Sequence, residues 1–258
     1  MRVQDDFVRK LASEGKRIDG RKMDETRPIE IISRPIEKAE GSALVRIGDT
    51  QVIAGVKLSV AEPYSDRPDE GSLMAGAEFS PIASPDFEPG PPNAESIELA
   101  RVIDRGIRES GAIDVKKLCI KKGEKVWMVS VDINILDNHG NLLDASALAA
   151  SAALANTVFP ALDKDGKVDF YAPKTKTKLP IAFKPVACTF YKVGDKMLLD
   201  PTRDEEHAAT ARITITTRDD GNVAAIQKGG IEGLTEEEIM YAAETSIKKG
   251  KDIRKLIK

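Results

Sequence analysis

A chain of 258 residues with 41% hydrophobic and 31% charged side chains can bury a full core, which excludes an intrinsically disordered protein. The formal net charge of −3 excludes a nucleic-acid binder that relies on its overall field, so any RNA contact must use a local basic patch. No apolar run approaches the ~18 residues of a membrane-spanning helix, and the first residues lack a signal-peptide pattern, so we expect a cytoplasmic protein with no membrane partner.

The first part of the chain alternates between strand and helix patterns. Apolar spacing predicts a helix at 3–13, strands at 43–47 and 51–60 around a Gly48-Asp49 hairpin, and a helix at 94–110. Five prolines between Pro81 and Pro92 predict an irregular connector before that helix. Strands are expected at 115–120 and 125–136. An alanine-rich helix is expected at 145–158, with small side chains that predict close packing on all sides.

The second part repeats this order. Strands are expected at 186–193, 196–199, 211–217 and 222–225. A capping box at Thr235–Glu238 opens a final helix, which Gly250 is expected to interrupt. Cys119 and Cys188 lie in apolar, strand-like surroundings and are expected to be buried free thiols rather than a disulfide or a metal pair. The pattern predicts an α+β fold in one domain, 1–258, with halves of about 1–160 and 161–258 whose helices pack on their sheets.

The loop at 137–144 connects a predicted strand to the alanine-rich helix, where proteins commonly bind phosphate. The chemistry of this loop is wrong for that purpose. Leu142 and Leu143 offer no polar contact, and no Arg or Lys occurs within the loop. We expect Asp144 to be the N-cap residue, whose carboxylate would satisfy the free amides and repel an anion. The segment is typical of an anion site that has been closed.

Three arginines of the helix at 94–110 form a candidate phosphate-binding face. At ~100° per residue, Arg101, Arg105 and Arg108 fall within about 60° of one another. Such a face could contact a phosphate backbone. It could equally be a solvated face, because Glu98, Asp104 and Glu109 offer ion-pair partners at helix spacing.

The carboxylates between Asp200 and Glu206 form a second candidate cluster. Clustered carboxylates can hold a divalent metal or act as a general acid, although a charged, solvated loop has the same composition. The two histidines, His139 and His207, lack the neighbours that a catalytic triad or a metal site needs, so we expect them to be loop residues. The residues alone identify no catalytic group, metal ligand set or cofactor.

Two stretches, 98–108 and 127–154, resemble the RNase PH family of phosphate-dependent exoribonucleases, and the resemblance extends from Arg17-Ile18-Asp19-Gly20-Arg21 to the final helix. It implies an RNase PH-like fold. Active members hold the attacking phosphate in a Gly-Gly-Ser/Thr-Arg loop, whose positions here read Gly140-Asn141-Leu142-Leu143, and a further family arginine falls at Glu95. Each lost charge-assisted hydrogen bond contributes roughly 1.5–3 kcal/mol, so the resemblance implies no useful phosphate binding. The paired acids of the family fall on Asp200 and Glu206.

This departure is similar to that of the silent RNase PH-like subunits of archaeal exosomes. The resemblance implies a non-catalytic subunit that pairs with an active RNase PH-like sister subunit, with three pairs in a six-membered ring that carries RNA-binding cap subunits. It also implies contacts with single-stranded RNA through Arg101 and Arg105, with Arg108, Lys57 and Arg67 as weaker candidates.

Two alternatives remain open. In the first, the chain is itself an active exoribonuclease, in which Asp200 and Glu206 hold a metal and other residues bind phosphate or water. In the second, it is a stand-alone RNA-binding module, which the acidic pI of ≈ 5.7 disfavours.

Overall fold

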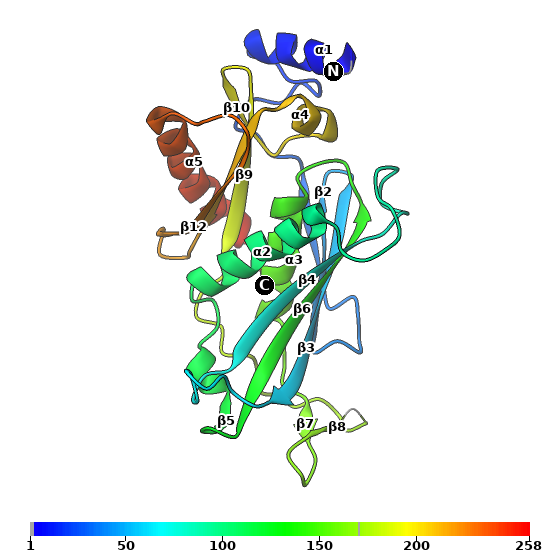
Figure 1. Cartoon of the computed structure of the whole chain (residues 1–258), viewed down its shortest axis with the longest axis vertical. Coiled ribbons are helices and arrows are strands. Elements are labelled where there is room, and N and C mark those ends of the chain that lie inside the picture. The colour runs from blue at the N-terminus through cyan, green and yellow to red at the C-terminus, as the bar shows by residue number, and fades with distance from the viewer. Residues whose placement is uncertain (1–2, 170) are drawn as a thin grey trace.

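The computed structural model describes residues 3–169 and 171–258. Its first sheet has the strand order β1-β2-β3-β6-β4, with β5 attached to β6 and β4 running parallel to β6. Figure 1 shows the long strands β3 and β6 side by side at the centre of this sheet. The strands are β1 Ile29–Ser33, β2 Gly41–Ile47, β3 Thr50–Ala61, β4 Ser72–Phe79, β5 Cys119–Lys121 and β6 Lys125–Asp137.

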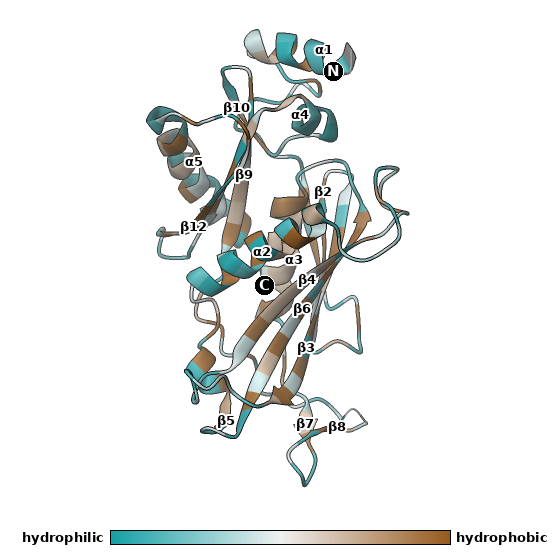
Figure 2. Ribbon diagram, in the orientation of Figure 1, coloured by the Kyte–Doolittle hydropathy of each residue, from teal (hydrophilic) through white to brown (hydrophobic). Residues whose placement is uncertain are grey.

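Alternating hydrophobicity explains the central strands of the first sheet. In β3 the buried positions begin at Thr50 and recur at every second residue as far as Leu58. Figure 2 shows the same alternation of hydrophobic and hydrophilic residues along β6. The predicted hairpin is confirmed, because Ile47 pairs with Thr50 across Gly48 and Asp49, and Gly48 has a φ of 56° that suits glycine.

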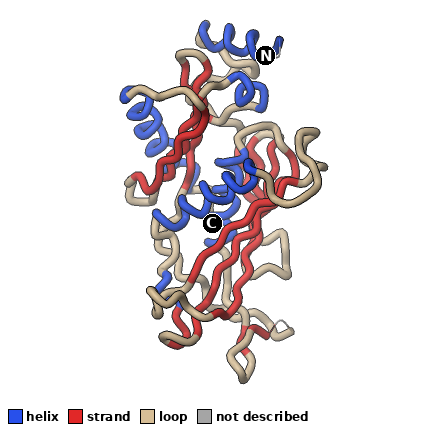
Figure 3. The backbone as a smooth tube through the Cα atoms, viewed as in Figure 1, coloured by secondary structure: helices blue, strands red, loops and turns tan. Residues whose placement is uncertain are grey.

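Two helices, α2 Ala94–Glu109 and α3 Leu142–Ala155, pack on the same face of the first sheet. The irregular connector between β4 and α2, drawn as a long tan loop in Figure 3, contains the five prolines. Helix α3 also contacts β9 of the second sheet and therefore lies between the two sheets. Its small side chains are buried on all sides, as the sequence predicts. The predicted bounds of 145–158 were wrong, since the helix begins and ends three residues earlier.

The second sheet has the antiparallel order β10-β9-β11-β12 and is covered by α5. Short segments complete the described chain: helix α1 packs on helix α4, and β7 pairs with β8. The remaining elements are α1 Val3–Ser13, the 3-10 helix η1 Val115–Leu118, β7 Ala161–Leu162, β8 Val168–Asp169, β9 Val186–Val193, β10 Lys196–Leu199, α4 Arg203–Ala208, β11 Ala211–Thr217, β12 Val223–Gly230 and α5 Glu236–Arg254.

Helix α5 confirms one prediction and corrects another. The capping box of Thr235 and Glu238 opens the helix, with both reciprocal hydrogen bonds present. The predicted interruption at Gly250 was wrong, because α5 continues to Arg254. Gly250 is buried, and a Cβ there would lie 2.6 Å from Oγ1 of Thr217. The glycine therefore allows the helix to approach β11 closely.

Two strand predictions also need correction. Residues Val115–Leu118 form a 3-10 helix, and only Cys119–Lys121 pairs with β6. The predicted strand at 222–225 extends to Gly230, because β12 pairs with β11 along most of its length. Cys188 is a buried free thiol, as predicted, whereas Cys119 is a free thiol that is only partly buried. The α+β architecture is confirmed, while the single domain with halves meeting near residue 160 stays a prediction.

Candidate functional site

The loop between β6 and α3 has a backbone conformation that only glycine allows at one of its positions. Gly140 has a φ of 92°, and a Cβ added there would lie 2.6 Å from the backbone nitrogen of Arg203. The next residue, Asn141, is the N-cap of α3 and has a left-handed φ of 56°. The loop is therefore packed directly against the first turn of α4.

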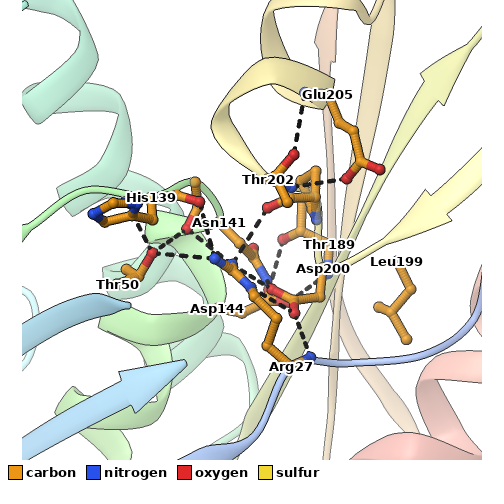
Figure 4. Close-up of polar contacts among 12 residues, drawn as sticks. Arg27, Thr50, His139, Asn141, Asp144, Thr189, Leu199, Asp200, Thr202 and Glu205 are labelled. Atoms are coloured by element: carbon orange, nitrogen blue, oxygen red, sulfur yellow. Dashed lines mark hydrogen bonds and ion pairs between the residues drawn. The ribbon is translucent and has the colours of Figure 1, made fainter. Parts of the chain in front are cut away.

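The guanidinium group of Arg27 ties this loop to the segment before α4. It donates hydrogen bonds to the backbone oxygens of His139 at 2.9 Å and Gly140 at 3.1 Å, and to Oδ1 of Asp200 at 2.7 Å. Oγ1 of Thr50 donates to the same Gly140 oxygen at 2.7 Å (Figure 4). Burial alone would lower the pKa of Arg27, but its hydrogen bond to Asp200 and the charge of that carboxylate keep the pKa raised.

Asn141 joins three carboxyl groups at the centre of the site. Its side-chain Nδ2 donates to Oδ2 of Asp144 at 2.9 Å and to Oδ1 of Asp200 at 2.7 Å. Its backbone N–H donates to Oε1 of Glu206 at 2.8 Å. Figure 4 shows Asn141 between Asp144 and Asp200. The Asn141 amide at the start of α3 is thus already bonded to a protein carboxylate, as the hypothesis of a closed anion site requires. That carboxylate belongs to Glu206 and not to Asp144.

The expected role of Asp144 was wrong. It lies within the first turn of α3, and the N-cap position belongs to Asn141. The Asp144 carboxyl group accepts hydrogen bonds from the backbone N–H of Thr189 at 3.0 Å and from its Oγ1 at 2.7 Å. Burial raises the pKa of Asp144 to about 7, so the group does not carry a full negative charge that would repel an anion at neutral pH. Asp144 instead connects α3 to the second sheet.

The acidic pair Asp200 and Glu206 faces protein donors. Burial would raise the pKa of Asp200, but the hydrogen bond and charge of Arg27 outweigh it and hold that pKa below its usual value. Burial raises the pKa of Glu206, although the Asn141 amide and the charge of Arg203 partly oppose the shift. Asp200 is fully buried, so its oxygens are satisfied by the fold itself.

Residues 17–21 contribute two arginines whose roles the sequence did not reveal. Arg17 makes a fully buried, two-point ion pair with Glu205, with Nη2–Oε2 at 2.6 Å and Nε–Oε1 at 2.9 Å. Arg21 donates from Nη1 to Oδ2 of Asp200 at 2.9 Å. The signal that could have identified them is the presence of two arginines in a segment of family resemblance, although their partners are about 180 residues away in sequence.

A cavity of about 390 Å³ opens beside the closed loop. Leu142 and Leu143 contribute apolar groups to its wall, and Glu95 from α2 contributes a carboxylate. The cavity therefore brings together three of the four positions where the sequence departs from the pattern of active RNase PH-like enzymes, the fourth being Asn141. Its further lining includes Glu206, Arg203, His207, Tyr191 and Arg212.

The three arginines of α2 lie along a groove between that helix and β4, but their surroundings differ. Arg101 and Arg105 are exposed, and Arg105 makes one long hydrogen bond of 3.4 Å to Gln227. Arg108 is engaged within the fold, since it donates to both oxygens of Asp104 and to the backbone oxygen of Leu73. Arg101 and Arg105 thus retain guanidinium groups that can turn toward a ligand, and the RNA role of all three stays a prediction.

The structure does not bring Lys57 together with these arginines. Lys57 lies on the face of β3 opposite to the helices, where its ammonium group pairs with the buried Glu40 at 2.8 Å. Arg67 lies in the loop before β4, with Asp66 and Glu70 as its nearest carboxylates at 3.9 and 3.7 Å. An RNA contact by either residue stays a prediction.

The described residues contain neither a metal-binding cluster nor a membrane-spanning helix. In residues 3–169 and 171–258, no group of three or more His, Cys, Asp and Glu side chains is arranged to hold a metal ion. No helix in these same ranges is long and apolar enough to cross a membrane.

Comparison with known proteins assigns the family. The model of the 3′ exoribonuclease family, domain 1, matches residues 25–160, and the model of its domain 2 matches residues 184–249. The chain belongs to the 3′ exoribonuclease (RNase PH) family. The predicted resemblance is thereby confirmed, and Asp200 and Glu206 lie in the part that matches domain 2 of the family.

Relatives within the family are similar over almost their whole length. The exosome complex component Rrp42 of Archaeoglobus fulgidus is 51% identical over 256 residues, which cover 99% of this chain and 96% of the relative. The Rrp42 of Thermococcus kodakarensis is 46% identical over 99% of this chain and 94% of its own. Among solved structures, a chain of the Archaeoglobus fulgidus exosome with RNA bound to the active site has a TM-score of 0.92 at 50% identity, with 99% and 98% coverage. A chain of an archaeal exosome core has a TM-score of 0.87 at 46% identity, covering 99% of this chain and 97% of that one.

Proposed function

We propose that this protein is a non-catalytic subunit of an exosome ring that degrades RNA from the 3′ end. In this proposal it pairs with an active RNase PH-like sister subunit, in a ring of three such pairs with RNA-binding cap subunits, in the cytoplasm. The observation that carries the proposal is the set of contacts that closes the loop at 140–144, in which Arg27 donates to the Gly140 carbonyl and Glu206 accepts from the Asn141 amide. The naming of its relatives as exosome components supports the assembly.

The contacts around this loop support the proposed lack of activity in physical terms. A phosphate nucleophile needs cationic or hydroxyl donors and free amides around it. Here Leu142 and Leu143 supply neither donor, Glu206 already accepts from the Asn141 amide, and Glu95 adds a negative charge to the adjoining cavity. Arg27 uses its donors on Asp200 and on two loop carbonyls. The two arginines that line the cavity also have carboxylate partners, since Arg203 pairs with Asp86 and Arg212 pairs with Glu98. An incoming anion would therefore meet apolar groups, carboxylates and arginines that are already paired with carboxylates.

The same contacts disfavour the alternative of an active, metal-dependent enzyme. Oδ1 of Asp200 accepts from Arg27 and Asn141, and Oδ2 accepts from Arg21 and Arg27. A divalent cation would have to displace these donors from a fully buried carboxylate, at a large electrostatic cost.

The RNA-binding part of the proposal rests on Arg101 and Arg105. Both are exposed on α2 beside the groove along β4, and neither forms an ion pair in the described residues. Guanidinium groups in such a place can contact successive phosphates of a single strand without reading its sequence. Arg108, Lys57 and Arg67 would add at most weaker contacts.

An assay of phosphorolysis tests this function. The purified chain is incubated with oligo(A), inorganic phosphate and Mg²⁺, alone and with a sister subunit whose loop reads Gly-Gly-Ser/Thr-Arg. We expect no nucleoside diphosphates from this chain alone, and release by the mixture at a rate above that of the sister alone. Release by this chain alone would overturn the proposal.

A further inference from the structure

One face of the first sheet carries no helix in the described residues. Both α2 and α3 pack on the other face, as Figure 1 shows beside β3, β6 and β4. We call the helix-free side the open sheet face. It consists of the outward positions of the strands, and large apolar side chains remain exposed there on the two edge strands and on β6: Met74 of β4 at 55%, Ile32 of β1 at 37% and Leu136 of β6 at 41%. Met74 also lines the groove beside α2. Exposed apolar groups that gather on one face are typical of an interaction surface.

Two carboxylates lie in the middle of this face without a counter-ion. Asp132 of β6 pairs in register with Gly76 of β4, and the next outward position on β4 is Glu78, so the two acids are diagonal neighbours. No ion pair or hydrogen bond of either side chain is present in residues 3–169 and 171–258. Burial raises the pKa of Asp132, and the charge of Glu78 raises it further. The ammonium group of Lys57, on the same face of the sheet, lies 2.8 Å from Oε1 of Glu40.

The surface around Asp132 is flat and open. Its register partners on both sides are glycines, Gly55 on β3 and Gly76 on β4. A Cβ placed on Gly76 would meet no atom within 4 Å, and one on Gly55 would meet only Ala39 at 3.9 Å. A long side chain from another molecule can therefore lie across the strands and reach both carboxylates.

We propose that the open sheet face docks the RNase PH-like sister subunit, which places an arginine or lysine side chain between Asp132 and Glu78. This inference rests on the proposed function, because it names the surface that the ring pairing uses. Charge complementarity selects the partner: two uncompensated acids attract a cationic side chain, and their exposed apolar neighbours suit the core of a protein interface, where arginine is enriched.

RNA is a poorer occupant for this face. Its phosphates would be repelled by Asp132 and Glu78, whereas the exposed arginines lie on α2, across β4 from the open face. The edge strand β4 thus separates a basic groove from an acidic, partly apolar surface. The two surfaces can serve RNA and the partner chain at the same time.

A binding experiment with charge-reversed variants tests the inference. The wild-type chain, Asp132→Lys and Glu78→Lys are each titrated with the purified sister subunit by isothermal calorimetry. Glu244→Lys, an exposed acid in the middle of α5, is the matched control. We expect each reversal on the open face to weaken the affinity at least tenfold, and the control to bind like wild type. The isolated variants should unfold at or above the wild-type temperature, because like-charge repulsion is removed.

Each other outcome has a distinct meaning. If wild type binds the sister and both reversals bind equally well, the docking face is wrong while the proposed function stands. If wild type itself fails to bind the sister, the proposed function fails and this inference fails with it. If the reversals leave the sister's affinity unchanged but strengthen RNA binding, the open sheet face belongs to RNA and the inference is overturned.

Discussion

Arg27 and Asp200 form a two-point ion pair that joins the N-terminal segment to the chain before α4. Nη2 of Arg27 lies 2.7 Å from Oδ1 of Asp200, and Nε lies 3.0 Å from Oδ2. Asp200 itself has a left-handed φ of 51°, a strained backbone for a residue other than glycine. The pair holds that backbone in place while Arg27 also grips the loop at 139–140. Stability and, in our proposal, the loss of phosphate binding therefore depend on the same contact.

Removing the charge of Asp200 should destabilise the protein strongly. Asp200→Asn keeps the shape of the side chain but leaves Arg27 buried without its counter-charge, which costs about 3–5 kcal/mol in comparable buried pairs. Urea unfolding at pH 7 measures the change. The control is Glu30→Gln, which breaks the exposed pair with Arg46 and should cost less than about 1 kcal/mol. Equal losses for the two variants would show that the buried pair is unimportant.

The pH dependence of stability should report Asp144. Its pKa rises from 3.8 to about 7 on folding, so the folded protein holds this proton more tightly than the unfolded chain. The resulting stabilisation is complete below the unfolded pKa and is lost as the pH rises through about 7. Asp144→Asn imitates the neutral form and should lack this loss. We expect the unfolding free energy of wild type to fall relative to the variant by a few kcal/mol between pH 4 and pH 7.5. Parallel curves for the two proteins would show that Asp144 is ionised.

An alanine at position 250 should destabilise α5, although alanine normally favours a helix interior over glycine by about 1 kcal/mol. The added Cβ would lie 2.6 Å from Oγ1 of Thr217, which is buried and accepts a hydrogen bond from Arg254. We expect Gly250→Ala to cost about 1–3 kcal/mol in thermal unfolding. In the Thr217→Ala background the same change should cost less. A stabilising effect of Gly250→Ala in the wild-type background would contradict the close approach.

Charge reversal on α2 should weaken RNA binding by the assembled complex. Arg101→Glu and Arg105→Glu each remove a phosphate contact, so each should reduce the log–log salt slope for single-stranded RNA by about 0.7. Arg108→Glu should have a smaller effect, since its guanidinium group is already engaged with Asp104 and Leu73. The control is Lys16→Glu, a charge reversal of the same sign at an exposed position outside α2. Unchanged slopes for Arg101 and Arg105 would mean that these residues form only a solvated face.

Local pattern was sufficient for much of the fold. The bounds of β9, β10 and β11 match the prediction because alternating apolar residues end at clear turns such as Gly194 and Asp219–Asn222. The start of α3 was predicted three residues too late. Asn141 precedes the helix in a left-handed conformation, which asparagine can adopt but does not require, so the sequence does not reveal it. The continuity of α5 through Gly250 depends on Thr217, which no local pattern shows.

The sequence predicts which phosphate-binding groups the site lacks, but it does not predict which residues contact one another there. Leu142, Leu143 and Glu95 stand out in the sequence by comparison with the active family loop. Arg27 does not, because an isolated arginine is expected to be solvent-exposed, and its partners at 139, 140 and 200 lie 112 to 173 residues away. The sequence likewise predicts a capping role for Asp144 from its position before a helical pattern. Its hydrogen-bond partner is instead Thr189 of β9, which is distant in sequence.

The most direct test of the central claim is a calorimetric titration of the purified chain with inorganic phosphate, beside an active family member whose loop reads Gly-Gly-Ser/Thr-Arg. With Glu206 on the Asn141 amide and Arg27 committed to Asp200, we predict saturable binding for the active protein and none for this chain. Saturable phosphate binding by this chain would contradict the account.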